Sequence, residues 1–132
     1  MSQPNEQFIK QMEDFGTLNG MPRSISRVLA YLIVCEPSRQ SAVAIQQGAK
    51  LSSGSVSSAV SMLRLAGLIE RHRSQDERRY YYELDSEGWR RSTIQKLQSL
   101  GQWVSLAEFG LKSSPRNPRL VMMRDIFKQF DQ

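Results

Sequence analysis

The apolar residues in the first half of the chain recur every three or four positions, which predicts a series of helices. A first stripe ends near Gly16 and consists of Phe8, Ile9, Met12 and Phe15. A second helix is expected to begin at Pro22, a residue suited to the first helical turn, and to stop before Pro37. Ser41 can cap a short third helix that ends near Gly48.

The stretch LSSGSVSSAVSMLRLAG, residues 51–67, keeps a helical period although serine is a poor helix former. Ser52 or Ser53 can cap a fourth helix that would run to residue 66, ahead of Gly67. On a helical wheel, at about 100° per residue, one face collects the apolar residues Val56, Ala59, Val60, Leu63 and Ala66. The opposite face collects Gly54, Ser57, Ser58, Ser61 and Arg64. The serines therefore form a surface of their own, with Leu65 at its edge.

Beyond residue 67 the apolar period changes from that of a helix to that of a strand. Residues 68–73 and 78–84 are predicted to form two short strands joined by residues 74–77. A helix is then expected from residue 86 to about 111, and a last one from 120 to 130. A short helix, a turn, a capped helix and a hairpin, in this order, are typical of a winged helix-turn-helix. The fold class is thus predicted as mostly α (α+β), with a two-stranded wing and flanking helices.

Apolar stripes also follow the outer helices, where their three- and four-residue spacing suits packing of helix on helix. An intramolecular core is the simpler origin of any one stripe, but 132 residues leave limited interior for several of them. The N- and C-terminal helices are therefore predicted to pack against a second copy of the chain. The candidate dimer residues are Phe8, Met12, Phe15, Leu97, Leu100, Val104, Leu111, Met123, Phe127 and Phe130.

The length of 132 residues fits one domain, so residues 1–132 are expected to form a single unit. Within it, residues 20–87 would form the winged helix-turn-helix core, and residues 1–19 and 88–132 the helical dimerisation elements. The net charge of +5 is unevenly distributed, because the first 20 residues are acidic and the remainder is basic. A basic remainder makes polyanions the first partners to consider.

Several classes of function find no support in the residues. No segment has the pattern of a secretory signal or the roughly 20 apolar residues of a membrane helix, so a cytosolic (cytoplasmic) protein is expected. Cys35 and His72 are the only cysteine and histidine, too few for a disulfide or a usual four-ligand metal site, and no cofactor is predicted. No catalytic constellation or phosphate-cradling glycine loop is visible, so the chain is not expected to be an enzyme.

Five segments resemble the MarR-type winged-helix transcriptional regulators in sequence and order. They are GMPRSISRVLAYLIVCEP (residues 20–37), SAVAI, LSSGSVSSAV, RLAGLIER (residues 64–71) and ERRYYYEL (residues 77–84), and the resemblance covers roughly residues 15–88. The MPRS opening and the SxGSVS recognition helix look most like the GbsR-like branch. The resemblance implies a dimeric bacterial DNA-binding regulator, usually a repressor, whose DNA affinity responds to a small molecule or another signal.

The resemblance also implies roles for individual residues. Asp76 stands two positions before Arg78, as in the family's wing pattern, which makes Arg78 the wing-tip residue and Asp76 its orienting partner. Leu84 and Gly88 match the family's Leu-x-x-x-Gly start of the following helix. Two positions depart from patterns in which glycine is usual: Ser26 in the second helix and Lys50 in the turn before the recognition helix.

Together these features predict an interface for duplex DNA with a palindromic operator. Short hydroxyl groups can approach phosphates and base edges closely in the major groove, and wing arginines would reach phosphates or the narrow minor groove. Ser41 would hold a phosphate at the start of its helix. The candidate DNA-binding residues are Ser41, Ser52, Ser53, Gly54, Ser55, Ser57, Ser58, Ser61, Arg64, Arg71, Arg73, Asp76, Arg78 and Arg79.

Several residues also fit roles that do not involve DNA. The serines alone are equally consistent with capping and solvation, and a winged helix used purely for protein contact would need an exposed apolar patch on the recognition helix. RNA binding would need exposed aromatic residues, and only Tyr81 is a candidate. Cys35 is more simply a buried thiol than a redox sensor, and His72 a solvent or DNA contact. The aromatic residues Phe8, Phe15, Trp89 and Trp103 could form a pocket for a cationic effector. Packing of these residues in the core is the favoured interpretation.

Overall fold

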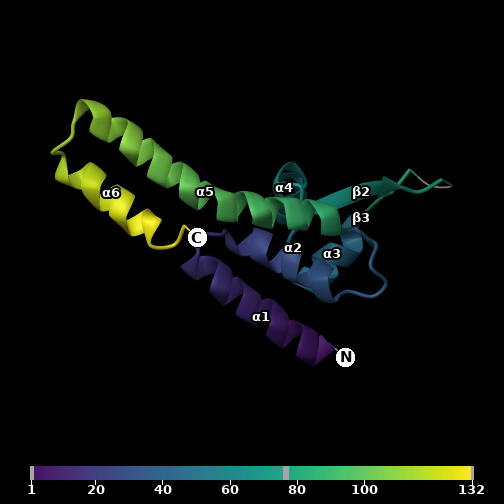
Figure 1. The fold of residues 1–132 in the computed structure, drawn as a ribbon. Coiled ribbons are helices and arrows are strands. Elements are labelled where there is room, and N and C mark those ends of the chain that lie inside the picture. The colour runs from purple at the N-terminus through teal and green to yellow at the C-terminus, as the bar shows by residue number, and fades with distance from the viewer. Residues whose placement is uncertain (1, 76–77, 132) are drawn as a thin grey trace. The chain divides into compact units, whose positions relative to one another are not determined.

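The computed structural model describes residues 2–75 and 78–131 and is mostly helical, with a small antiparallel sheet (Figure 1). It divides into two compact units, Met1–Trp89 and Arg90–Gln132. The first unit holds the helix-turn-helix and the sheet, and the second is a helical hairpin. This architecture confirms the predicted winged-helix fold class. No helix in the described ranges is long and apolar enough to cross a membrane.

Four helices make up most of the first unit: α1 Ser2–Leu18, α2 Arg23–Val34, α3 Ala42–Ala49 and α4 Ser53–Leu65. The first helix continues past Gly16, where the sequence predicts its end. Pro22 lies just outside α2 as its N-cap, with a ψ of 148°, rather than within the first helical turn. The helices α3 and α4 begin directly after Ser41 and Ser52, as their capping patterns predict.

Gly16 provides close packing between α1 and α2 instead of ending α1. A Cβ atom at this position would collide with the side chain of Ser26, which is fully buried. Ser26 stands where glycine is often found in the branch that the motifs resemble, and the missing side chain at Gly16 provides the room that Ser26 needs. As a result α1 lies along α2 (Figure 1).

The core of the first unit forms around α2, whose Val28 and Leu32 are buried. The apolar face of α4 packs into this core, as predicted, through Val56, Ala59, Val60 and Leu63. Ala66, predicted to share that face, is exposed, because it lies in the turn that leads from α4 to Gly67. Trp89 packs against the core, which agrees with the core role favoured for this residue.

The wing has three strands rather than the two predicted: β1 Gln40–Ser41, β2 Ile69–Arg73 and β3 Tyr80–Leu84, in the order β1-β3-β2. Gln40 pairs with Tyr82 and Ser41 with Tyr81 in antiparallel register. A strand of two residues is too short to show an alternating pattern, so the sequence does not reveal it. The strands β2 and β3 are also shorter than predicted, and Arg78 lies ahead of β3.

The start of helix α5, Ser86–Ser113, approaches the end of α4 closely because of two glycines. Gly67 has a φ of 78°, a left-handed conformation that ends the turn after α4. A Cβ atom at Gly88 would collide with the carbonyl oxygen of Gly67. The Asp85 carboxylate accepts from the Gly88 N–H at 2.9 Å. These contacts show why the Leu-x-x-x-Gly motif at the start of α5 has glycine at position 88.

In the second unit, α6 Pro118–Lys128 runs back along the C-terminal part of α5 (Figure 1). The side chain of Asn117 caps α6 and starts it earlier than predicted. The rings of Trp103 and Phe127 are stacked with their centroids 4.9 Å apart, and Val104 is buried. Two candidate dimer residues, Val104 and Phe127, thus have packing partners inside one chain.

Candidate nucleic-acid interface

Two serine side chains cap the helices of the helix-turn-helix. The hydroxyl oxygen of Ser41 accepts from the Ala44 N–H at 3.2 Å at the start of α3. The hydroxyl oxygen of Ser52 accepts from the Ser55 N–H at 3.1 Å at the start of α4, so Ser52, and not Ser53, is the cap. A capping hydroxyl group keeps its proton for a second acceptor, so Ser41 can still donate to a phosphate oxygen.

The polar face of α4 lies at the surface, as the helical wheel predicts. Ser55 is half-buried beside the cap, and the exposed members are Ser53, Gly54, Ser57, Ser58, Ser61 and Arg64. Within the described part of the chain, the hydroxyl groups of Ser57, Ser58 and Ser61 form no hydrogen bond. The helix contains no acidic residue. This face therefore offers hydroxyl groups and one cation to an outside partner.

Two large apolar side chains of α4 are exposed beside the serines. The exposed fraction is 53% for Met62 and 83% for Leu65. The sequence pattern places Leu65 at the edge of the polar face but does not single out Met62, although the wheel puts it close to Ser58. Exposed apolar groups on such a helix suit either the methyl group of thymine in the major groove or a protein partner.

The wing presents a basic face on β2. Arg71 and Arg73 are exposed, and their Cζ atoms lie 4.0 and 5.6 Å from the centre of the Tyr80 ring. Because alternate residues of a strand point to the same face, both arginines lie on one side of the hairpin. The predicted wing residues Arg71 and Arg73 are thus brought together at one aromatic side chain.

The predicted wing tip is only partly described. Arg78 and Arg79 are exposed between the two wing strands, and the Arg79 carbonyl accepts from the Ser74 N–H at 3.1 Å. Asp76, predicted to orient Arg78, lies outside the described residues. The role of Asp76 therefore stays a prediction.

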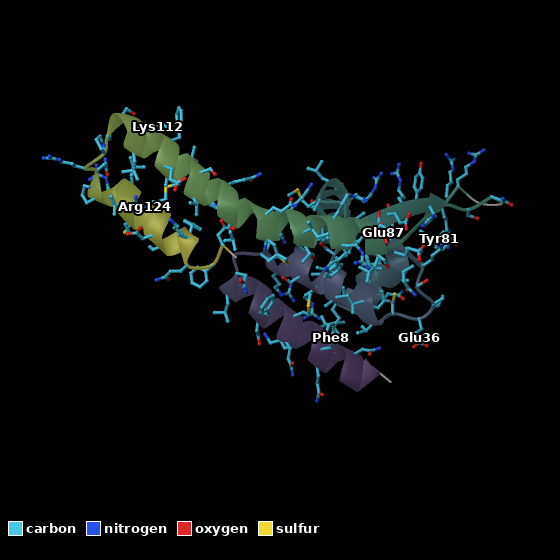
Figure 2. The ribbon with its side chains drawn as sticks, in the orientation of Figure 1. Phe8, Glu36, Tyr81, Glu87, Lys112 and Arg124 are labelled. Carbon is cyan, nitrogen blue, oxygen red and sulfur yellow. The ribbon has the colours of Figure 1, made fainter. Side chains whose placement is uncertain are left out.

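The opposite face of the wing is organised around Glu83. Its Oε1 accepts from Arg39 Nε at 3.0 Å and lies 2.8 Å from His72 Nε2. Its Oε2 accepts from the Ser38 hydroxyl group at 3.2 Å. Burial alone would raise the pKa of Glu83, but the hydrogen bonds from Arg39 and Ser38 hold that pKa below its ordinary value. His72, expected to contact solvent or DNA, is half-buried beside Glu83. Half-buried Tyr81 lies opposite His72 in the register, and Figure 2 labels Tyr81 on the wing.

Three side chains on the same face of the wing as Glu83 bring potential metal ligands together. Glu70, His72 and Glu83 each place one ligand atom within 4.8 Å of the others. Arg39 already pairs with Glu83, however, and compensates its charge. The ion pair with Arg39 therefore gives Glu83 a counterion within the protein, and we assign no metal to the cluster.

The turn between α3 and α4 is held by one left-handed residue and one buried arginine. Lys50, at the position where glycine is usual in MarR-type sequences, has a φ of 58° and a ψ of 54°. A side chain in this conformation costs about 1 kcal/mol. The carbonyl of the preceding residue, Ala49, accepts from Arg27 Nε at 2.8 Å. Arg27 thereby fixes the backbone next to the strained position.

Arg27 also joins α1 to the helix-turn-helix. Its buried guanidinium places Nη1 2.8 Å from an oxygen of Glu13 and Nη2 3.1 Å from an oxygen of Glu6, both on α1. The hydrogen bond from Arg27 holds the pKa of Glu13 below its ordinary value. Burial alone would lower the pKa of Arg27, but its two glutamate partners raise it. One network thus links α1, α2 and the turn ahead of α4.

Cys35 lies half-buried at the end of α2. Its Sγ atom lies 3.6 Å from the carbonyl oxygens of Leu32 and Ser38. Burial raises the pKa of the thiol, which disfavours the reactive thiolate form. These surroundings agree with a structural thiol rather than with a redox sensor.

The candidate dimer residues differ in their exposure within one chain. Phe15, Leu97 and Phe130 are exposed. Those that are half-buried are Phe8, Met12, Leu100, Leu111, Met123 and Phe127. On α5 and α6, the exposed apolar residues that the sequence pattern does not place among the candidates are Ile94, Trp103, Leu106, Phe109, Met122 and Ile126. An extensive apolar surface thus remains on α5 and α6, and dimerisation stays a prediction.

The fold and the exposed helix face together define a winged helix-turn-helix protein. The chain is 30% identical over 125 residues to the HTH-type transcriptional regulator MmpR5 of Mycobacterium tuberculosis, a match that spans 91% of this chain and 76% of the relative. The chain therefore belongs to the helix-turn-helix-type transcriptional regulators. This relation confirms the predicted class of function, a regulator and not an enzyme.

Solved structures give the same result. The chain resembles a transcriptional regulator with a TM-score of 0.72 and 28% identity, over 97% of this chain and 90% of that one. NadR in complex with 4-hydroxyphenylacetate shares the fold with a TM-score of 0.50 and 18% identity, over 98% and 88% of the two chains. No family model matches the sequence. The winged-helix fold that the motifs predict is thus confirmed, whereas membership of the MarR type and of its GbsR-like branch stays a prediction.

Proposed function

We propose that the chain binds duplex DNA sequence-specifically as a homodimer and acts as a repressor. The observation that carries this proposal is the exposed serine face of α4, which ends at Arg64 and contains no acidic residue. In a winged helix, the second helix of the helix-turn-helix enters the major groove, where hydroxyl groups meet base edges and phosphates. Membership among transcriptional regulators supports the same function.

Different parts of the interface would have different tasks. Ser41 would donate to a phosphate at the start of α3, and the arginines of the wing would meet phosphates or the narrow minor groove. Such contacts place the protein on the duplex but carry little sequence information. Discrimination between sequences would therefore depend on the serines of α4 and on Arg64.

Titration of a random-sequence duplex at several salt concentrations tests whether the chain binds DNA. If two subunits together neutralise roughly 6 to 10 phosphates, log affinity should fall with log salt at a slope of about −5 to −9. The slope arises because each neutralised phosphate releases condensed counterions. A flat salt dependence, or no binding at low salt, would contradict the proposal.

Dimerisation is supported by the exposed apolar side chains of the second unit. The double variant Leu97→Asp and Phe109→Asp should yield monomers and lose specific DNA binding, because each half-site alone binds weakly. Both side chains are exposed, so the substitutions should leave the fold of one chain intact. Leu97→Met with Phe109→Leu keeps the surface apolar and should remain dimeric. Light scattering at micromolar concentration decides the question, and a stable wild-type monomer would contradict it.

A response to a small molecule belongs to the same proposal. NadR, which shares the fold, was solved in complex with 4-hydroxyphenylacetate. The MPRS and SxGSVS motifs add support through their resemblance to the GbsR-like branch of a family whose members respond to small molecules or other signals. Such a ligand would change DNA affinity by binding the free and the DNA-bound conformations unequally.

A second candidate function is docking of a protein partner through Met62 and Leu65. The exposure of these two side chains is the observation that favours it. Docking alone predicts that Leu65→Ser abolishes binding of the partner, and that the wild-type chain shows no salt-dependent affinity for duplex DNA. Titration of the random-sequence duplex therefore separates the two functions.

A further inference from the structure

Arg71 and Arg73 of the wing share one aromatic ring. Their Cζ atoms lie 4.0 and 5.6 Å from the centre of the Tyr80 ring, and a cation–π contact extends to about 6 Å. In the register of β2 and β3, Arg73 stands directly opposite Tyr80, and Arg71 reaches the ring diagonally. The ring therefore gathers two guanidinium groups on one side of the hairpin.

These two arginines form no ion pair with a carboxylate among the described residues. Glu70 and Glu83 lie opposite each other in the register, on the other face of the hairpin, where Glu83 pairs with Arg39. Two cations beside one ring repel each other when no counterion is near. Because a polyanion relieves that repulsion, this face has the chemistry of a phosphate-binding surface.

Tyr80 also lies between these arginines and the cap of α3. The sheet order β1-β3-β2 places β3 between the strand of Ser41 and the strand of Arg71. Tyr80 and Ser41 line the same hollow, together with Val43. The capping serine, the aromatic ring and the guanidinium groups thus follow one another across the wing.

We propose that Tyr80 is a positioning residue of the wing, whose ring holds the guanidinium groups of Arg71 and Arg73 ready for the phosphates of the DNA backbone. The inference rests on the proposed DNA binding. An arginine side chain loses rotamer freedom when it binds, and a side chain already held by a ring has less to lose. Tyr80 thus raises DNA affinity without reading the sequence.

Substitution of Tyr80 by leucine and by phenylalanine tests this role on a fluorescent random-sequence duplex. An exposed cation–π contact corresponds to about a two- to fivefold change for each wing, so a dimer should lose about 4- to 25-fold in affinity with Tyr80→Leu. Tyr80→Phe keeps the face of the ring and should bind within about twofold of wild type. Tyr81→Leu, on the opposite face of β3, is the matched control and should leave the affinity unchanged.

Two further measurements separate positioning from a general structural role. Tyr80→Leu added to Arg71→Ala and Arg73→Ala should cause no additional loss, because the ring acts only through these arginines. In the free protein, the NMR signals of the arginine Nε–H groups should show ring-current shifts in wild type and in Tyr80→Phe, but not in Tyr80→Leu. An additive loss, or signals that do not depend on the ring, would overturn the inference.

The outcomes also separate this inference from the proposed function. If wild type binds the duplex and Tyr80→Leu binds it equally well, the positioning role is wrong and the DNA-binding function stands. If wild type does not bind duplex DNA at any salt concentration, both are wrong.

Discussion

Replacing Arg27 with alanine is expected to lower the free energy of unfolding by about 3 kcal/mol. The substitution removes the buried cation between Glu6 and Glu13, which keep only the exposed side chains of Lys50 and Arg23 as partners. It also leaves the Ala49 carbonyl without its hydrogen bond. Removing one partner of a buried ion pair is costly, because the remaining charge loses its compensation while it stays partly shielded from water. Urea unfolding at a fixed protein concentration, followed by circular dichroism, measures the loss.

Arg23→Ala provides a matched control for this prediction. Arg23 Nε lies 3.0 Å from the same glutamate, Glu13, but its side chain is 58% exposed. An exposed ion pair contributes less than about 1 kcal/mol, so this variant should unfold almost like wild type. Equal stability of the Arg23 and Arg27 variants would show that the buried network does not hold α1 to the turn ahead of α4.

The same network gives the stability a defined pH dependence. Pairing with Arg27 holds the pKa of Glu13 below its ordinary value in the folded chain. The stability that this pairing supplies is fully present above a pH of about 4.3, and it is lost as the pH falls through the lowered pKa. The difference in unfolding free energy between wild type and Glu13→Gln should therefore shrink as the pH falls below the ordinary pKa of a glutamate.

Replacing Ser57 and Ser61 together with alanine is expected to weaken operator binding by about 1 to 3 kcal/mol, while binding to random DNA barely changes. Both serines are exposed on α4, and within the described residues neither hydroxyl group forms a hydrogen bond. Alanine is the better helix former, so the free protein should become more stable by a few tenths of a kcal/mol at each site. Competition binding and urea unfolding measure the two effects.

This combination distinguishes functional serines from solvated ones. A more stable protein that discriminates less well between DNA sequences is expected only if the hydroxyl groups contact base edges. Arg78→Ala provides the contrast, because loss of a wing charge should weaken specific and random binding by similar factors. If the double alanine variant keeps its selectivity, the serines do not discriminate between DNA sequences, and Arg64 and the wing must do so.

The sequence predicts those parts of the fold and site that depend on residues close together in the sequence. The helical period separates buried Val60 from exposed Ser57 on α4, as the structure has it. Ser41 and Ser52 are recognisable as caps because each side chain bonds to the backbone three residues further on. Local periodicity and capping chemistry are therefore enough to place the candidate recognition helix.

Contacts between distant residues account for what the sequence does not reveal. Arg27 meets Glu13 and Glu6 across separations of 14 and 21 residues, which no periodicity encodes. The pairing of β1 with β3, and the position of Tyr80 between Ser41 and Arg71, follow from the sheet order. The second copy proposed to cover the exposed apolar surface on α5 and α6 lies beyond a single chain, so it follows from neither the sequence pattern nor the fold.

Recovery and sequencing of genomic fragments bound by the wild-type chain tests the central claim most directly. A two-fold dimer with two recognition helices predicts an enriched imperfect palindrome, with half-site centres about one helical turn, roughly 10 bp, apart. The same fragments should compete for the protein far better than random DNA of equal length. Bound fragments that share no sequence motif beyond that of the input DNA would contradict sequence-specific recognition by the serine face of α4.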